Sequence, residues 1–297
     1  MNSEKLKRPI FHFIFFLSLV LLSAEAEAKR KDINYTDPTG PIYRDDFRES
    51  IPTPSQKIRI VSYNIKFSEK LASVIKTFKT DPILKNAEVI ALQEVVGEPG
   101  SPTEHAAHQI AKALHMAYVY APAIIHSQNG KDFGNAILSR YTLSNSRKLI
   151  LPHVHFLKKS QRIALGATLD VGALPLDIYS IHAETQQPNR WRTEQGMVPV
   201  YDAKELDAKR VITLGDYNTI RWSSRYLLRK AYEKNGYREI SKGYGCSFRV
   251  WKFCVVQLDH IYAKGIEVEQ NDSIQNGGVL RDVKVSDHFP LWFDAKL

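Results

Sequence analysis

Arg210-Val-Ile-Thr-Leu-Gly-Asp-Tyr-Asn-Thr219 is an apolar run that stops at a glycine and then presents a carboxylate and a carboxamide two positions apart. The apolar residues predict a buried strand, and Gly215 allows the backbone to turn where that strand ends. We therefore expect Asp216 and Asn218 at the rim of a sheet. A carboxylate that can accept a proton, beside an amide that can hold a water molecule or a phosphate oxygen, suits phosphoester hydrolysis. Read alone, an ordinary turn is the commoner explanation.

The N-terminus has the pattern of a signal peptide. Lys5, Lys7 and Arg8 precede an apolar run over residues 10–22, and small residues up to Ala28 offer cleavage sites. A membrane anchor is the alternative, but the run is shorter than the roughly 20 apolar residues of a spanning helix. No cysteine directly follows the run, which disfavours a lipoprotein. We expect residues 1–28 to be removed from a secreted or periplasmic protein that does not stay inserted in a membrane.

Composition indicates one basic globular domain. About 270 residues remain after cleavage, enough for a sizeable core. The hydrophobic fraction is 43% and the formal net charge is +9, which cleavage leaves unchanged. A basic exported domain is attracted to polyanions such as nucleic acid or anionic lipid headgroups. Solubility alone explains the charge equally well.

Cys246 and Cys254 are the only cysteines. In an oxidising compartment, two cysteines this close in sequence predict a disulfide across a hairpin or loop, whereas a metal site made of two cysteines is disfavoured. Such a bond would hold the segment that leads into Leu258-Asp-His-Ile261.

Residues 29–56 contain four prolines among polar residues, which predicts an extended surface arm before a domain at 57–297. Apolar stretches predict strands at residues 57–65, 87–94, 118–121, 134–140, 162–170, 176–182, 255–263 and 291–296, with another starting at Gly265. Helical spacing or composition favours helices at 68–79, 103–115, 191–206 and 223–234. Many strands, few helices and no internal repeat predict a layered α+β sandwich.

Polar residues recur where apolar strands end. This set comprises Asn64, Glu94, His182, Asp216 and Asn218, followed later by Asp259 and the pair Asp287-His288. One such residue carries little information. Repetition at so many strand ends predicts that the ends meet at a common edge, where a site is assembled from distant positions.

The motifs that carry these residues resemble, in their order, the motif set of the endonuclease/exonuclease/phosphatase superfamily. They are Tyr63-Asn64, Leu92-Gln-Glu94, Gly134-Asn-Ala-Ile-Leu-Ser-Arg140, Ile181-His182, Gly215-Asp-Tyr-Asn218, Leu258-Asp-His-Ile261 and Ser286-Asp-His288. The resemblance covers residues 57–297. It implies a four-layered α/β/β/α sandwich, in which two packed, mainly antiparallel sheets are flanked by helices. It also implies hydrolysis of phosphodiesters or phosphomonoesters with a divalent metal.

By this resemblance, Glu94 is expected to be the main metal ligand, helped by Asn64 and Asp287. So sparse an oxygen set suits Mg²⁺, which keeps several waters, better than zinc; Mn²⁺ and Ca²⁺ are the alternatives. Asn64 also fits a turn cap.

The remaining roles also follow from the resemblance. Asp216 would orient or deprotonate the attacking water, with Asn218 beside it to bind the phosphate. His182 and His288 would flank the phosphate, either stabilising its charge or protonating the leaving group. Asp259 would keep His288 charged and correctly turned.

Arg162, at the start of its strand as in the secreted deoxyribonuclease branch of the superfamily, would be a phosphate clamp. Plainer explanations exist as well. Glu94 also fits a solvated residue at a strand end, and Asp287-His288 before a proline also fits a turn. Arg162 also fits a surface charge, and His182 also fits a core histidine.

Export, charge and the expected disulfide favour a monomeric nuclease with nucleic acid as its substrate. The alternative is a phosphoesterase that acts on phospholipid headgroups or inositol phosphates. Leu258 and His260 differ from the cysteine and arginine usual in inositol phosphatases, and residues 250–253 form only a short apolar candidate for membrane contact. A third interpretation is a non-catalytic binding module that keeps the fold. We expect the loops at 126–132 and 152–161 to decide the substrate.

Overall fold

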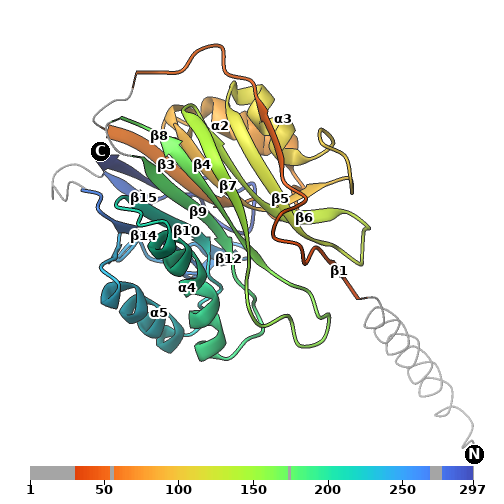
Figure 1. Ribbon diagram of the computed structural model, residues 1–297, viewed down its shortest axis with the longest axis vertical. Helices are drawn as coiled ribbons and strands as arrows, with labels where there is room; N and C mark the ends of the chain where they lie inside the picture. The colour runs from red at the N-terminus through yellow and green to blue at the C-terminus, as the bar shows by residue number, and fades with distance from the viewer. Residues whose placement is uncertain (1–30, 54–56, 173–174, 268–275, 297) are drawn as a thin grey trace, which may run out of the picture.

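The computed structural model describes residues 31–53, 57–172, 175–267 and 276–296. Two β-sheets pack face to face, and each is covered on its outer face by helices (Figure 1). The predicted signal peptide, residues 1–28, lies outside the described residues. None of the helices in the described part of the chain is long and apolar enough to cross a bilayer.

The first sheet contains eight strands in the described ranges and runs in the order β1-β5-β6-β4-β3-β16-β15, with β2 also paired to β5. Its strands are β1 (Ile33–Asn34), β2 (Tyr43–Asp46), β3 (Lys57–Asn64), β4 (Val89–Gly97), β5 (Ala117–Ile125), β6 (Asp132–Ser139), β15 (Gly277–Val279) and β16 (Leu291–Lys296). Helices α2 (Leu71–Thr80) and α3 (Ala106–Leu114), with a short 3-10 turn at Leu84–Asn86, cover its outer face.

The second sheet runs in the order β11-β14-β10-β9-β8-β7. Its strands are β7 (Thr142–Ile150), β8 (Ile163–Asp170), β9 (Leu176–His182), β10 (Val211–Asp216), β11 (Arg238–Glu239) and β14 (Asp259–Lys264). Helices α4 (Asn189–Glu205) and α5 (Trp222–Lys234) cover it, at the lower left of Figure 1. A separate hairpin is formed by β12 (Phe248–Val250) and β13 (Phe253–Val256).

Three apolar clusters hold these four layers together. The largest lies between the sheets and includes Ile137, Leu165 and Leu214, all fully buried. A second packs α2 and α3 on the first sheet, and a third packs α4 and α5 on the second. Among the described pairings only β3 with β4 and β9 with β10 are parallel, because each of these pairs is joined through a helix. The predicted α/β/β/α sandwich of mainly antiparallel sheets is confirmed.

Several predicted elements differ in detail. Strand β7 was not predicted, because Ser144, Asn145 and Ser146 interrupt its apolar pattern at an irregularity in its pairing with β8. The predicted continuous strand 255–263 is wrong: β13 ends at Val256 and β14 begins at Asp259, so the chain changes partners between them. Of the strand expected from Gly265, the described part is an isolated bridge at Glu267, and residues 268–275 lie outside the description.

The described part of the predicted arm, residues 31–53, belongs to the first sheet. Strands β1 and β2 both pair with β5, and the arm runs along the outer edge of that sheet (Figure 1). These strands contain two and four residues, too few to show a hydrophobic period in the sequence. The folded part of the chain therefore starts earlier than residue 57.

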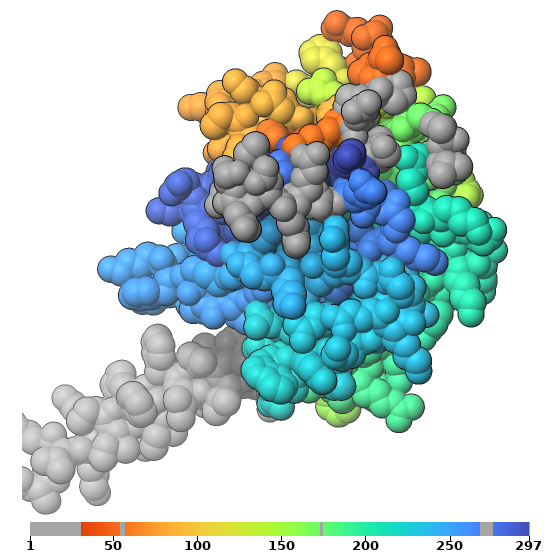
Figure 2. Space-filling view, turned by 90° about the vertical axis from the view of Figure 1, so that its left-hand side faces the viewer, coloured from red at the N-terminus to blue at the C-terminus, as the bar shows by residue number. Residues whose placement is uncertain are grey.

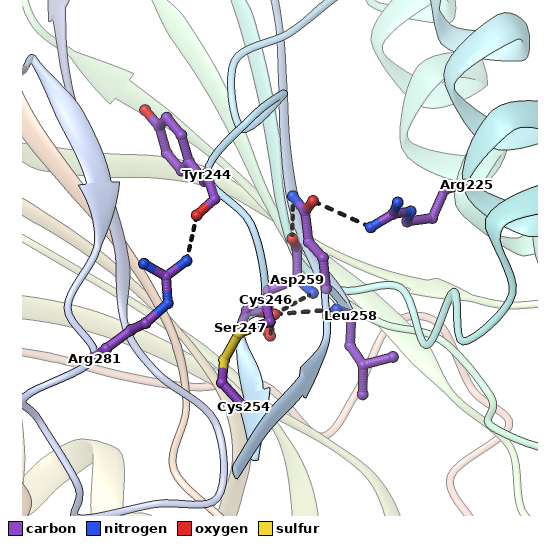
Figure 3. Close-up of a disulfide and its surroundings, with 9 residues drawn as sticks. Arg225, Tyr244, Cys246, Ser247, Cys254, Leu258, Asp259 and Arg281 are labelled. Atoms are coloured by element: carbon purple, nitrogen blue, oxygen red, sulfur yellow. Dashed lines mark hydrogen bonds between the residues drawn. A yellow bond between two sulfur atoms is a disulfide. The ribbon is translucent and has the colours of Figure 1, made fainter.

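The predicted disulfide between Cys246 and Cys254 is present, and it closes the β12–β13 hairpin (Figure 3). Ser247 follows directly. Its hydroxyl donates to Asp259 Oδ2 at 2.6 Å and accepts from the backbone N–H groups of Leu258 and Asp259. The hairpin is thus tied to the first residue of β14.

Candidate active site

The polar strand ends meet at one edge of the sandwich. Asp216, the last residue of β10, is in register with His182 of β9 on one side and Asp259 of β14 on the other. The facing sheet contributes Asn64 and Glu94. Several of these strand ends, with residues of the neighbouring loops, border a cavity of about 720 Å³, whose lining does not include Asn64 and Asp259. It is lined by Phe67, Glu94, Phe133, Arg162, His182, Thr185, Asp216, Asn218, Ile220, Phe248, Val255, Val256, Leu258, Asp287 and His288.

The turn after β10 fixes the central carboxylate. Gly215 has φ +142°, and a Cβ there would lie 2.1 Å from the carbonyl oxygen of Ile181 in the parallel strand β9. Only glycine lets the two strands approach so closely. Asp216 Oδ1 then accepts a hydrogen bond from the backbone N–H of Asn218 at 2.9 Å. Because it is buried, and in spite of the nearby His288 charge, the pKa of Asp216 is raised above the usual range of a carboxyl group.

Asn64 bridges the two carboxylates. Its Nδ2 donates to Glu94 Oε1 at 3.0 Å and to Asp216 Oδ2 at 3.2 Å. Its Oδ1 accepts from the backbone N–H of Lys66, so the turn cap considered for this residue exists alongside its contacts in the site. Glu94 has a left-handed backbone with φ +58°, at an irregularity in the pairing of β4, and its Oε2 accepts from the N–H of Phe67. A non-glycine residue held in this conformation is typical of functional sites.

Glu94 and Asp287 fit a hard cation in their donor chemistry. Both carboxylates border the cavity, and burial, reinforced by the charge of Asp287, raises the pKa of Glu94. A cation would relieve this unfavourable concentration of negative charge, and Mg²⁺ needs only one or two protein carboxylates because it retains water. No group of three or more His, Cys, Asp and Glu side chains among the described residues has the arrangement of a closed metal site.

His288 carries a positive charge. Its Nδ1 lies 2.8 Å from Asp259 Oδ2, and its Nε2 lies 3.6 Å from Asp216 Oδ2. Burial alone would lower the pKa of this imidazole, but the charges of Asp259 and Asp216 outweigh it and raise the pKa to about 10. The ring of Phe248 packs edge-on against it with centroids 5.0 Å apart.

His182 is electrostatically the opposite of His288. Burial, together with the charges of Arg162 and His288, holds the pKa of His182 well below its ordinary value. Its Nε2 is 3.7 Å from Asp216 Oδ2 and 3.9 Å from Glu94 Oε1, beyond hydrogen-bond distance, and its Nδ1 has no hydrogen-bond partner in the described protein. His182 is thus a neutral imidazole at neutral pH, and it both packs in the core and faces the cavity.

Arg162 is not an ordinary surface charge, because its side chain is only 15% exposed. Its Nε donates to Glu184 Oε2 at 3.2 Å, and its guanidinium lies 5.1 Å from the centre of the Phe133 ring. The buried Nη1 has no hydrogen-bond partner among the described residues. A guanidinium that borders the cavity with an unused N–H is suited to bind an anion.

Several supporting residues escaped sequence analysis. Glu184, fully buried, fixes Arg162 and is itself held through Thr185. Asn135 donates from its Nδ2 to the carbonyls of Ile163 and Ser180, so that the motif starting at Gly134 ties the sheets together. Such residues have no local sequence signal apart from their place within or just after a strand-end motif.

The two loops expected to decide the substrate do not line the cavity. Residues 126–132 and 152–161 lie next to two residues that do, Phe133 and Arg162. The β12–β13 hairpin lines the cavity instead, through Phe248, Val255 and Val256.

Comparison with known proteins gives one family match. A sequence model of the Endonuclease/Exonuclease/phosphatase family matches residues 61–288. No curated protein matches the chain.

Three solved structures illustrate the fold. Humanized TDP2 of D. rerio matches with a TM-score of 0.60 and 17% identity, covering 82% of this chain and 100% of that one. An endonuclease/exonuclease/phosphatase family protein of Bacteroides thetaiotaomicron has the same score and identity, covering 82% and 98%. A mannosyl-6-phosphatase of the same bacterium matches with a TM-score of 0.60 and 16% identity, covering 81% and 100%. At these identities the structures establish a shared fold.

Proposed function

Since the chain belongs to the Endonuclease/Exonuclease/phosphatase family, whose members hydrolyse phosphoester bonds, we propose that it is an exported, divalent-metal-dependent phosphodiesterase that cleaves nucleic acid. The observation that carries the chemistry is the position of Asp216. Its Oδ2 lies 3.6 Å from the charged His288 and 3.7 Å from the neutral His182, and it accepts a hydrogen bond from Asn64.

These groups divide the reaction among them. Asp216, whose pKa is raised by burial, is suited to accept the proton of an attacking water. His288, kept charged by Asp259, stabilises negative charge on the phosphate oxygens and can supply a proton to the leaving group. His182, being neutral, donates a hydrogen bond from one ring nitrogen without adding charge.

Two further residues bind the phosphate. Arg162, whose buried Nη1 has no hydrogen-bond partner among the described residues, and Asn218 both border the cavity. Asn218 Nδ2 donates to the carbonyl of Ala183 at 2.8 Å, which fixes the amide beside Asp216. Glu94 and Asp287, with Asn64 orienting Glu94, would hold the cation, which supplies charge neutralisation at a phosphate oxygen.

Three features support nucleic acid as the substrate. The net charge is +9, which attracts a polyanion. The cavity combines cationic and acidic groups for a phosphate with aromatic side chains, Phe67, Phe133 and Phe248, that can contact a base or a sugar. Export, predicted from residues 1–28, is supported by the disulfide, because such bonds persist in oxidising compartments.

Hydrolysis of phospholipid headgroups is a second candidate, favoured by the exposed apolar surface of the β12–β13 hairpin. Trp251 is 89% exposed and Phe253 is 64% exposed, with Lys252 between them. In Figure 2 this blue part of the chain, near residue 250, protrudes at the left of the molecule. Because the same hairpin lines the cavity, contact of its tip with a lipid surface would bring headgroups to the site.

One substrate panel tests both candidates. The protein without residues 1–28 is incubated with plasmid DNA, RNA, a small chromogenic phosphodiester, and vesicles containing sphingomyelin or phosphoinositides. Each reaction is run with Mg²⁺, Mn²⁺ or Ca²⁺ and with a chelator, alongside Asp216→Asn. Nucleic acid cleavage that needs a metal and Asp216 supports the nuclease. Turnover of lipid alone would replace it with the second candidate, and turnover of no substrate would favour a non-catalytic module.

A further inference from the structure

A second hollow lies beside the catalytic cavity, on the exposed side of helix α5. This α5 cleft has a volume of about 270 Å³ and is lined by Trp222, Arg225, Tyr226, Arg229, Glu239, Lys242, Gly243 and Gln257. None of these residues borders the catalytic cavity. The α5 cleft is therefore a separate hollow, to which the catalytic mechanism assigns no role.

The α5 cleft and the catalytic cavity are lined by residues that are close in the chain. Gln257 of the cleft is followed directly by Leu258 of the cavity, and Ile220 of the cavity lies two residues before Trp222 of the cleft. Because one or two residues span at most about 7 Å, the two hollows lie near each other, within the reach of a chain-like substrate that has one phosphate in the cavity.

The α5 cleft offers an aromatic platform to solvent. Trp222 is 69% exposed, and its ring centroid lies 5.7 Å from that of Tyr226, one helical turn later. The guanidinium of Arg229 lies 5.7 Å from the Tyr226 ring. Exposed aromatic side chains next to cations are the surface on which unpaired bases stack, since each base has a π face.

The charges of the α5 cleft favour an anion. The cleft lining contains three cations and one carboxylate: Arg225, Arg229 and Lys242 with Glu239. That carboxylate is already engaged, since Glu239 Oε1 lies 2.9 Å from His260 Nδ1. The charge of Arg229 is partly compensated by Glu233, which is not part of the cleft lining and whose Oε1 lies 3.6 Å from Arg229 Nε.

Arg225 reaches from α5 toward the segment before Asp259, where its Nη1 donates to Gln257 Oε1 at 3.4 Å (Figure 3). This neutral contact positions the guanidinium without cancelling its charge. Among the described residues, neither Arg225 nor Lys242 forms an ion pair within 4.0 Å, although the charge of Lys242 acts on Glu233 from a greater distance.

We propose that the α5 cleft is a subsite for single-stranded nucleic acid, which holds nucleotides next to the one whose phosphate occupies the catalytic cavity. Trp222 stacks on a base, while Arg225 and Lys242 contact neighbouring phosphates. The inference rests on the proposed nuclease function and adds to it a preference for unpaired strands, because a base must be unstacked to lie on Trp222.

Binding is measured by fluorescence anisotropy with a labelled oligothymidylate of about 12 nucleotides, a length within the usual range of such sites. The protein carries Asp216→Asn and is kept in chelator, so that no cleavage occurs. Trp222→Ala should raise Kd by roughly 5- to 100-fold, the usual loss from one stacked base, and Trp222→Phe should restore most of it. Arg225→Gln with Lys242→Gln should lower the slope of log K against log salt by about 1.4, because each lost contact contributes about 0.7 for a single strand.

The matched control is Lys76→Gln with Lys79→Gln. It removes the same charge from exposed positions on α2, which covers the other sheet. Its salt slope should stay at the parent value. If the control lost as much salt slope as Arg225→Gln with Lys242→Gln, the effect would come from net charge alone and the proposed subsite would be overturned.

Turnover in the otherwise wild-type protein separates this inference from the proposed function. Trp222→Ala should raise KM for the oligonucleotide and leave kcat/KM for a small chromogenic phosphodiester unchanged, which also shows that the variant folds. Oligonucleotide cleavage with an unchanged KM in Trp222→Ala would overturn the subsite and leave the nuclease standing. Hydrolysis of the small diester by a wild-type protein that binds no oligonucleotide would overturn the nuclease itself. If Trp222→Ala weakened binding to phosphatidylserine vesicles and left oligonucleotide binding unchanged, the α5 cleft would be a lipid site and the proposal would be overturned.

Discussion

His288 Nδ1 lies 2.8 Å from Asp259 Oδ2, and the same oxygen accepts the hydroxyl of Ser247 at 2.6 Å. Asp259 does not border the catalytic cavity, whereas His288 does. In the proposed mechanism the carboxylate therefore acts through the histidine, as a positioning residue that keeps the imidazole charged and fixes which nitrogen would face a phosphate.

Replacing Asp259 with asparagine should therefore lower kcat far more than it raises KM. The amide keeps the shape of the side chain but cannot hold a charged imidazole. We expect a loss on the order of 10²- to 10⁴-fold in kcat, as for other histidines deprived of their carboxylate. Steady-state kinetics on a small phosphodiester measures the split. Asp282→Asn, an exposed aspartate near the same segment, is the control and should match the wild type. A normal kcat in Asp259→Asn would remove Asp259 from the mechanism.

Removing the proposed cation ligand should abolish both turnover and stabilisation by metal. In Glu94→Gln we expect a loss of about 10³-fold or more in kcat, since charge neutralisation by a metal is worth several kcal/mol. Wild-type protein in Mg²⁺ at 100 times its Kd should gain about 2.7 kcal/mol in free energy of unfolding over protein in chelator. Glu94→Gln should gain almost none.

Glu98→Gln makes the same chemical change a few residues further on, outside the cavity, where Glu98 pairs with Lys131. Thermal unfolding with and without Mg²⁺ should give the wild-type shift in this control. A full metal-induced shift in Glu94→Gln would place the cation elsewhere.

The protein should lose part of its stability in acid because of His105. This residue caps α3: its Nδ1 accepts the N–H of His108 at 3.1 Å, and its Nε2 lies 2.9 Å from the carbonyl of Pro102. Burial lowers the pKa of His105 to about 4. Protonation of Nδ1 would also remove the acceptor of the His108 N–H. The unfolded state, with a pKa near 6.5, binds this proton first as pH falls. The stabilisation is therefore complete above about pH 6.5 and is lost as pH falls through about 4.

The stability lost over the whole titration of His105 is on the order of 3 kcal/mol. His105→Asn keeps a cap oxygen but cannot titrate, so its free energy of unfolding should fall less between pH 7.5 and 4.5 than that of the wild type. Urea unfolding at several pH values measures the difference. His115→Asn, at an exposed histidine after α3, serves as the control and should follow the wild-type pH dependence. Parallel curves for wild type and His105→Asn would mean that His105 titrates normally.

The close approach of β9 and β10 should make Gly215 intolerant of any side chain. Gly215→Ala places a Cβ 2.1 Å from the Ile181 carbonyl oxygen, which the two strands cannot relieve without separating. We expect destabilisation by more than about 3 kcal/mol, together with loss of activity. Gly243→Ala is the matched variant, because Gly243 also has positive φ, +89°, but open space around it. Chemical denaturation should show a loss of only about 1 kcal/mol there. Equal losses in the two variants would attribute the effect to φ alone.

Strands β1, β2 and β7 and the β12–β13 hairpin could not be predicted from the sequence, and each has a physical reason. The period of β7 is hidden by three polar residues at an irregular register, and β1 and β2 are too short to have one. The continuous apolar run through Val255 and Val256 conceals a change of pairing, since local hydrophobicity does not specify a partner strand. Because the sequence did not show this change of pairing, it also did not show that the β12–β13 hairpin, and not the predicted loops, lines the cavity.

The sequence by itself determined the chemical inventory: which strands end in a carboxylate, an amide or an imidazole, and in which order. That information is local, because a buried strand, a glycine and a polar residue follow one another along the chain. Only the tertiary structure decided what each group does. His182 and His288 have the same side chain, yet burial beside Arg162 keeps one neutral while contact with Asp259 charges the other. A pKa is set by the solvent that a group loses and the charges that surround it, and both come from strands and loops distant in sequence.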